Sequence, residues 1–180
     1  MLQITKKMKE SQYNQLISYM YQRCDAFTFH LPNYDNKDGS IDNFNRLESK
    51  GNQEYLDYLQ NIDDWLRNFE KYLLSRWISN EYIDSIHGYY SEIWVVKLVI
   101  ELSPYLYLGT SFDNWNFPKL PEDLSFYSKG KCFFHTIAHE YLYFIYTDDD
   151  LDKLVLKKIG IKYVEMPDST IPDISYTLTY

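Results

Sequence analysis

Hydrophobic residues change their spacing near Ser79, and this change limits the folds open to the 180-residue chain. Before it, apolar residues recur at steps of three and four over residues 3–27 and again over residues 53–78. Such steps place one buried stripe on each of two long helices. After it, the apolar residues form short runs rich in β-branched and aromatic side chains, which are typical of strands. The sequence therefore predicts helices first and strands afterwards.

The first predicted strand is Glu92–Leu102, an almost uninterrupted apolar run of the kind found in central strands. Pro104 separates it from a second predicted strand over residues 105–110. We expect Leu124–Tyr127 and Cys132–Ile137 to form a hairpin, because the loop between them is short and contains a glycine. The other predictions are a loop over residues 30–42, a short helix over 81–86, a strand over 141–146, a helix over 151–159 ending at Gly160, and a strand over 161–166.

Helices precede strands here instead of alternating with them. We therefore predict an α+β fold in which N-terminal helices pack on a largely antiparallel β-sheet formed by the C-terminal half. A chain of this length buries roughly 70% of its unfolded surface, which suits one domain. Within that domain we expect residues 1–86 to be mainly helical, residues 87–166 to be mainly β, and residues 167–180 to form a loosely held tail.

The chain is acidic, with a net charge of −8 and a sequence pI of about 4.9. Nucleic-acid binding needs clustered lysine and arginine, so this composition argues against it. The chain also contains 19 tyrosines, a residue type well suited to binding surfaces. Negative charge and tyrosines together favour a basic protein partner. The alternative, that the charge only maintains solubility, stays open. The acidic side of the predicted helix over residues 53–78 carries Glu54, Asp57, Asp63, Asp64 and Glu70.

Cys24 and Cys132 are far apart in the sequence and match no disulfide framework or metal-ligand spacing, so we expect reduced thiols. The first residues lack the basic and apolar segments of a signal peptide. The longest apolar stretch, Ile93–Ile100, is interrupted by Lys97 and is too short to span a bilayer. We expect a soluble cytoplasmic protein without membrane contact.

Two histidines in the segment Phe112–Thr147 are the main candidates for chemistry. On a helix, His135 and His139 would share one face at a spacing that suits zinc or another divalent ion. The flanking aromatic runs favour a strand followed by a turn, with the dipeptide His139-Glu140 in the turn. No third metal ligand is identified in the sequence, so a structural or partner-contacting role is favoured over a metal site or an acid–base pair.

A segment with the sequence Phe-Pro-Lys-Leu-Pro-Glu-Asp-Leu-Ser-Phe (residues 117–126) precedes Gly130, an aromatic strand and His139-Glu140. This arrangement resembles the C-terminal half of small uncharacterised bacterial proteins, some of which are similar to immunity proteins of polymorphic toxin systems. The resemblance covers residues 105–163. It implies a cytoplasmic protein that neutralises a partner by binding it, and it carries no catalytic residues.

We therefore predict a non-enzymatic, immunity-like acidic binding protein that neutralises a basic protein partner. It needs no cofactor, and neither nucleic acid nor a membrane is expected as a partner. Its candidate binding residues are Trp115, Glu122, Asp123, His139 and Glu140. The alternative is a metal-dependent hydrolase that uses His135, His139 and Glu140, with the two histidines as ligands of a divalent metal such as zinc.

Overall fold

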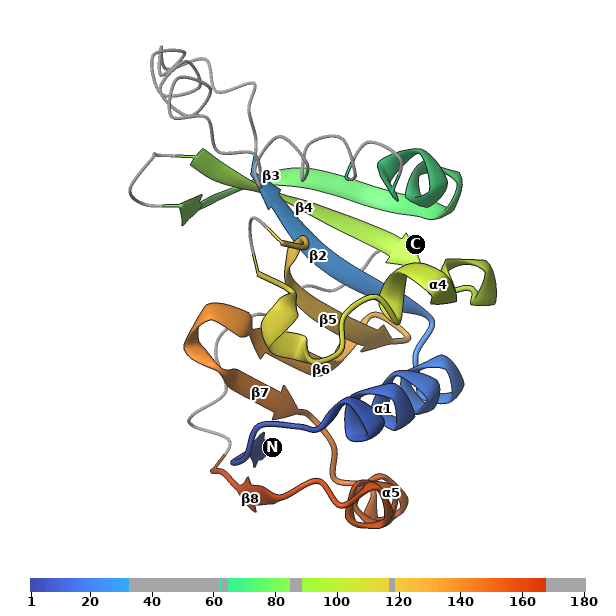
Figure 1. The fold of residues 1–180 in the computed structure, drawn as a ribbon, viewed down its shortest axis with the longest axis vertical. Helices are drawn as coiled ribbons and strands as arrows, with labels where there is room; N and C mark the ends of the chain where they lie inside the picture. Colours follow the sequence, from blue (N-terminus) through green and yellow to red (C-terminus); the bar gives the residue numbers. More distant parts are fainter. Residues whose placement is uncertain (33–61, 63–64, 85–88, 117–118, 168–180) are drawn as a thin grey trace.

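The computed structural model describes residues 1–32, 62, 65–84, 89–116 and 119–167. Its main feature is an eight-stranded sheet with the strand order β3-β4-β2-β5-β6-β7-β1-β8. Every neighbouring pair of strands is antiparallel. In Figure 1 the sheet extends from β3 at the top to β8 at the bottom. The predicted α+β class and the antiparallel sheet are confirmed.

The strands are β1 (Leu2–Ile4), β2 (Ala26–Pro32), β3 (Leu73–Asp84), β4 (Tyr89–Lys97), β5 (Glu122–Ser128), β6 (Lys131–Ile137), β7 (Leu142–Ile145) and β8 (Tyr163–Glu165). The α-helices are α1 (Glu10–Arg23), α4 (Ser103–Leu106) and α5 (Asp150–Ile159), and residues 65–69 are also helical. The 3₁₀ turns are η1 (Glu70–Tyr72), η2 (Ile100–Leu102), η3 (Phe112–Asn114) and η4 (Ala138–Glu140).

The predicted helix over residues 3–27 is too long at both ends. Only Glu10–Arg23 is helical, while β1 precedes it and β2 follows it. In β2 the large apolar residues Phe27, Phe29 and Leu31 alternate with other residues, which is the pattern of a strand. Phe27 also continues the three- and four-residue spacing of the apolar residues in α1. At this residue the helical pattern and the strand pattern therefore coincide. Because β1, β2 and β3 all lie before residue 86, the first part of the chain contributes three strands as well as helix.

Three further element predictions are wrong. The helix predicted over residues 53–78 does not continue past Tyr72, because β3 begins at Leu73 and runs to Asp84, across most of the short helix predicted over 81–86. The second predicted strand, over residues 105–110, is not a strand at its start, because residues 105 and 106 belong to α4. Pro104 lies in the first turn of this helix, where its missing N–H leaves no hydrogen bond unmade.

The C-terminal predictions are confirmed. β5 and β6 form the expected hairpin, with Ser128 opposite Lys131. The two residues of its turn, Lys129 and Gly130, both have positive φ, 51° and 77°, as a type I′ turn requires. α5 follows β7 and ends at Gly160, which adopts the left-handed conformation. β8 then pairs with β1.

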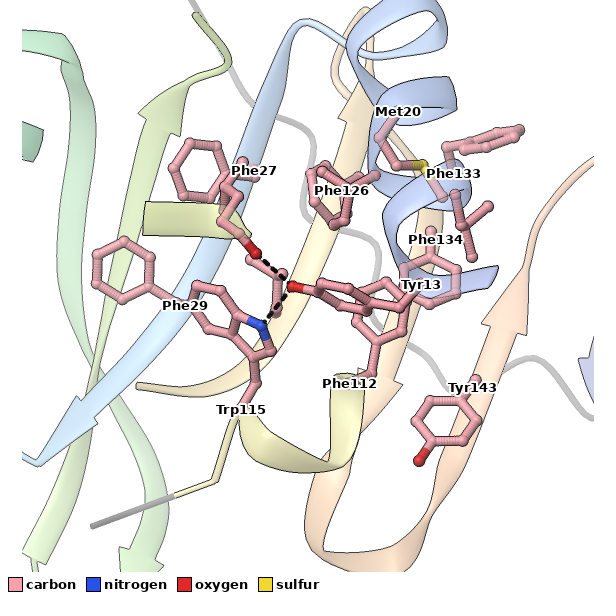
Figure 2. Packing of buried hydrophobic residues seen from close by; sticks show 14 of the residues in the cluster. Tyr13, Met20, Phe27, Phe29, Phe112, Trp115, Phe126, Phe133, Phe134 and Tyr143 are labelled. Carbon is pink, nitrogen blue, oxygen red and sulfur yellow. Dashed lines mark hydrogen bonds between the residues drawn. The ribbon is translucent and has the colours of Figure 1, made fainter. Parts of the chain in front are cut away.

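One face of the sheet forms the main core. A row of apolar residues crosses neighbouring strands in register: Phe27 lies opposite Phe126, Phe126 opposite Phe134, and Phe134 opposite Ile145. Helix α1 adds its buried residues to the same cluster, namely Tyr13, Leu16, Ile17 and Met20. Figure 2 shows Tyr13 and Met20 among the aromatic residues of this cluster. Each aromatic side chain removed from water in this way stabilises the fold by about 2 kcal/mol.

Buried polar residues lie on the opposite face, which we call the back face. Strand register places Thr28 opposite Ser125, and His30 opposite Glu122. Ser91 Oγ lies 3.0 Å from His30 Nδ1, and Ser125 Oγ lies 2.9 Å from His135 Nδ1. Polar groups out of contact with water need partners, and each serine hydroxyl supplies one to a ring nitrogen of its histidine. His135 Nε2, the other ring nitrogen, is buried without a hydrogen-bond partner among the described residues.

Some predictions fall on residues outside the described part of the chain. These are most of the loop over residues 30–42, the first part of the helix over 53–78 with Glu54, Asp57, Asp63 and Asp64, and the tail after Pro167. Within the described residues, no helix is long and apolar enough to cross a membrane.

Candidate functional site

Asp123 fixes the geometry at the start of β5. Its φ of 54° places it in the left-handed region, at an irregularity where two β5 residues stand opposite one residue of β2. Its backbone N–H donates to the carbonyl oxygen of Trp115 at 3.3 Å. Its side-chain Oδ1 accepts a hydrogen bond from the backbone N–H of Ala138 at 2.7 Å. Asp123 therefore ties the beginning of β5 to turn η4.

The Ala138 hydrogen bond brings a histidine next to two carboxylates. Metal-ligating atoms of Glu122, Asp123 and His139 all lie within 4.8 Å of one another. Glu122 projects from the back face and is 7% exposed, Asp123 is half-buried, and His139 is exposed. We call the group formed by Glu122, Asp123, His139 and Glu140 the acidic corner.

The outer part of the acidic corner is open to solvent. The side chain of Glu140 is 56% exposed, and its Oε1 lies 3.8 Å from His139 Nε2. Tyr141 follows, 64% exposed, with a left-handed φ of 57°. A non-glycine residue in this conformation costs roughly 1 kcal/mol, and an exposed ring recovers little of it by burial. Turn η4 thus presents a carboxylate and an aromatic ring side by side on the surface.

This arrangement can bind positive charge in two ways. Two carboxylates and an imidazole match the donor types of a zinc site with three protein ligands and an open position. The hydrogen bond from Ala138 would hold the Asp123 carboxylate in place, as outer-shell bonds do around metals. The same carboxylates can instead accept hydrogen bonds from an arginine or lysine of a protein partner.

The other histidine of the predicted pair does not belong to this group. His135 is 6% exposed and lies on the back face of β6. Ser125 Oγ donates to the Asp123 carbonyl at 3.2 Å, so we assign the proton of His135 to Nδ1, which then donates to Ser125 Oγ. Burial lowers the pKa of His135 to about 4, so the ring is neutral at physiological pH. The ligand pair His135 and His139 is therefore replaced by Glu122, Asp123 and His139.

Trp115 is a core residue and not a surface contact. It is fully buried, and its Nε1 donates to the hydroxyl oxygen of Tyr13 at 2.9 Å. The Tyr13 hydroxyl in turn donates to the Leu106 carbonyl, and Figure 2 shows both bonds. Of the predicted binding residues, Trp115 supports the site only through the carbonyl that receives the Asp123 N–H.

Neither cysteine suits nucleophilic chemistry. Burial raises the pKa of Cys132 to about 12, and it raises the pKa of Cys24 still further. Both side chains are therefore thiols at neutral pH, whereas the thiolate is the reactive form.

Glu122, Asp123 and His139 were predicted together as binding residues but not as metal ligands that share one site, although the sequence contains the signal. Residues 124–127 and 132–137 were expected to pair as a hairpin, and Phe126 does stand opposite Phe134. Continuing that register brings residues 122 and 123 to the level of residues 137 and 138. The predicted turn at His139 would then lie beside the two carboxylates.

Comparisons of this chain with models of known protein families, with curated proteins and with solved structures find no match.

Proposed function

We propose that the chain is a non-enzymatic binding protein of the cytoplasm, immunity-like in its action, that neutralises a basic protein partner. The acidic corner is its proposed contact site. The observation that supports this most strongly is the presence of the exposed Glu140 and Tyr141 directly beside the converging carboxylates of Glu122 and Asp123. Tyrosine is enriched among the residues that dominate binding energy, and carboxylates supply the charge that an arginine or lysine requires.

The distribution of charge along the sequence agrees with this proposal. Residues 33–61, 63–64 and 168–180 together contain ten Asp and Glu but only three Lys and Arg. The described residues are therefore nearly balanced in charge. Excess negative charge anywhere on the chain attracts a basic protein over distances of about 10 Å, whereas specificity needs a defined local contact. We assign that contact to the acidic corner.

Affinity capture with two matched double variants tests the proposal. The first variant, Glu140→Gln with Tyr141→Ala, removes the exposed groups of turn η4. The second, Glu101→Gln with Tyr107→Ala, makes the same chemical changes at two other exposed residues. From the cells that produce the protein, the wild type and the second variant should retain a basic protein, and the first should retain at least tenfold less of it.

The proposal is wrong if the captured protein is acidic, or if both double variants lose it equally. Equal loss would mean that overall charge and tyrosine content, and not the acidic corner, determine binding.

A second candidate function, a metal-dependent hydrolase, is favoured by one observation. The ligand atoms of Glu122, Asp123 and His139 lie close enough together to share one ion. A bound divalent metal would polarise a substrate oxygen or activate a water. Calorimetric titration with zinc or manganese tests this. The hydrolase requires one site per chain that is lost in Asp123→Asn and in His139→Ala and kept in Asp148→Asn, and heat that no corner variant reduces would exclude it.

A further inference from the structure

Helix α5 exposes two leucines on the side that faces away from α1. Its inner side carries the buried residues Asp152 and Leu156, and Asp152 accepts a hydrogen bond from Arg23 of α1. Its outer side carries Leu151 and Leu154, which are 61% and 62% exposed. In Figure 1, α5 lies at the end of the molecule beside β8, with α1 above it. The proposed function does not use this helix.

Opposite charges lie at the two ends of the outer side. Asp150, Leu154 and Lys158 follow one another at four-residue steps, so they form one row along the helix, and all three are exposed. Neither Asp150 nor Lys158 forms an ion pair within the described part of the chain. The row is therefore negative at the N-terminal end of α5, apolar in the middle and positive at the C-terminal end.

The helix dipole explains only part of this row. Acidic residues near the N-terminus and lysines near the C-terminus stabilise a helix by themselves. That effect accounts for the charges but not for the two exposed leucines between them, because apolar side chains gain free energy only when they leave water. A partner that covers the leucines and also pairs with both charges would use the whole row.

We propose that α5 pairs with α5 of a second copy of this chain, with the two helices antiparallel. A two-fold axis at Leu154 brings the Leu154 side chains of the two copies together. It also places Asp150 of each copy opposite Lys158 of the other, since both residues are four positions from Leu154. Leu151 then lies against Lys157 of the other copy, whose aliphatic stem can cover it.

The order of charges is what favours a second copy over a different protein. A symmetric dimer uses the same surface on both copies, so that surface must be complementary to itself. The row from Asp150 to Lys158 meets this requirement only in the antiparallel direction, where each end pairs opposite charges. A parallel pair would place Asp150 beside Asp150 and Lys158 beside Lys158.

The size of the contact predicts a weak dimer. Helix α5 has ten residues and is therefore about 15 Å long. Two such helices bury less than the roughly 1,600 Å² of a typical stable interface, so we expect a dissociation constant of about 10–100 µM. The net negative charge of the chain does not prevent association, because physiological salt screens charges that are more than about 8 Å apart.

Sedimentation velocity of the purified protein, at physiological salt and at concentrations on both sides of this dissociation constant, tests the proposal. The wild type should shift from monomer to dimer as its concentration rises. Leu154→Gln should weaken the dimer at least tenfold, because it removes the apolar centre of the contact. Leu108→Gln changes a leucine that is 58% exposed elsewhere on the surface and should leave the dimer unchanged. A wild type that stays monomeric, or equal losses in the two variants, would overturn the proposal.

Charge reversal tests the antiparallel geometry. Asp150→Lys and Lys158→Asp should each weaken self-association at least tenfold, because each places like charges opposite one another. The two changes move the net charge in opposite directions, so a loss in both cannot come from overall charge. An equimolar mixture of the two variants should dimerise about as well as the wild type, since both contacts of the mixed dimer again pair opposite charges. A mixture that dimerises no better than the separate variants would overturn the proposal. The basic protein partner is absent from these experiments, so their outcome is independent of the proposed function.

Discussion

Gly109 occupies a position where two buried side chains leave no room for a methyl group. A Cβ at this residue would come within 2.5 Å of Trp115 Nε1 and 2.9 Å of the Tyr13 hydroxyl oxygen. These are the two groups that hydrogen-bond to each other beneath the sheet. We expect Gly109→Ala to lower the free energy of unfolding by about 2 kcal/mol, because an overpacked core must shift. Urea denaturation measures this, and an unchanged midpoint would show that the core has more space than the structure indicates.

Tyr141 combines a strained backbone with an exposed side chain. Glycine adopts positive φ without steric cost, so Tyr141→Gly should raise the free energy of unfolding by about 1 kcal/mol. The greater conformational entropy of glycine in the unfolded chain reduces this gain. The same change should weaken capture of the basic partner. A variant that is less stable than the wild type would mean that the Tyr141 ring contributes more to folding than to binding.

At the level of single residues, the sequence predicted candidates but not their surroundings. Glu122, Asp123, His139 and Glu140 were proposed as a group, and the structure places three of them within reach of one ion. Trp115 was proposed with them, yet it is buried. Burial depends on contacts with residues such as Tyr13, which is 102 positions away, and no local pattern reports those contacts.

Among the elements, α1 and α5 are joined by one buried carboxylate. Asp152 of α5 is 1% exposed and accepts hydrogen bonds from Tyr19 and Arg23 of α1 and from Thr147. Burial alone would raise the pKa of Asp152, but these hydrogen bonds and the charge of Arg23 lower it below its usual value.

We expect Asp152→Ala to lower the free energy of unfolding by about 3 kcal/mol, since it leaves the partners of the carboxylate without an acceptor. Asp150→Ala, in the same helix turn but exposed, should cost less than about 1 kcal/mol. Chemical denaturation of both variants gives the comparison. Equal losses would show that both carboxylates stabilise the protein only at the N-terminus of α5, and that the contact of Asp152 with α1 adds nothing.

Strands β2 and β6 each contribute a histidine that stays neutral in the folded protein. Burial lowers the pKa of His30 and of His135 to about 4, and the proximity of His135 adds to the effect on His30. The unfolded chain binds protons below about pH 6.5, whereas the folded protein binds them only near pH 4. The free energy of unfolding should therefore fall as the pH decreases from about 6.5 to about 4, by up to about 3 kcal/mol per histidine.

Urea denaturation at several pH values tests this prediction. His135→Gln should show a shallower dependence on pH than the wild type, because one of the two titrating groups is gone. If the wild type and His135→Gln lose stability in parallel, carboxylates and not His135 cause the pH dependence.

Element type was predictable where local chemistry determines it. The β5–β6 turn requires positive φ at two residues, and α5 ends at a glycine, so both were found. β3 was missed although its partner β4 comes next in the chain, because the three- and four-residue spacing of apolar residues before β3 continues into its first part. β1 was missed because its partners are distant. Leu2 pairs with Ile145 on one side and Glu165 on the other, and such pairing leaves no signal in a short segment.

For the whole molecule, strand order shows how far folding depends on remote contacts. β1 lies between β7 and β8, and β2 lies between β4 and β5, so the N-terminal segments complete a sheet whose other strands come later in the chain. This arrangement brings residues 3–7 next to Tyr141 and Tyr143, where together they line an open surface pocket of about 430 Å³. Sequence patterns predicted the α+β class correctly, but they could not predict this insertion, because it depends on the register of pairs far apart in sequence.

The most direct test of the account is site-specific photo-crosslinking from the acidic corner. A photoreactive residue replaces Tyr141 in one variant and Tyr107 in the control, and each is irradiated in the cells that produce the protein. We predict that the Tyr141 position forms a crosslink to one basic protein, that the Tyr107 position does not, and that adding Glu140→Gln reduces the product. Crosslinks of equal yield from both positions, or a product unaffected by Glu140→Gln, would contradict the assignment of the acidic corner as the binding site.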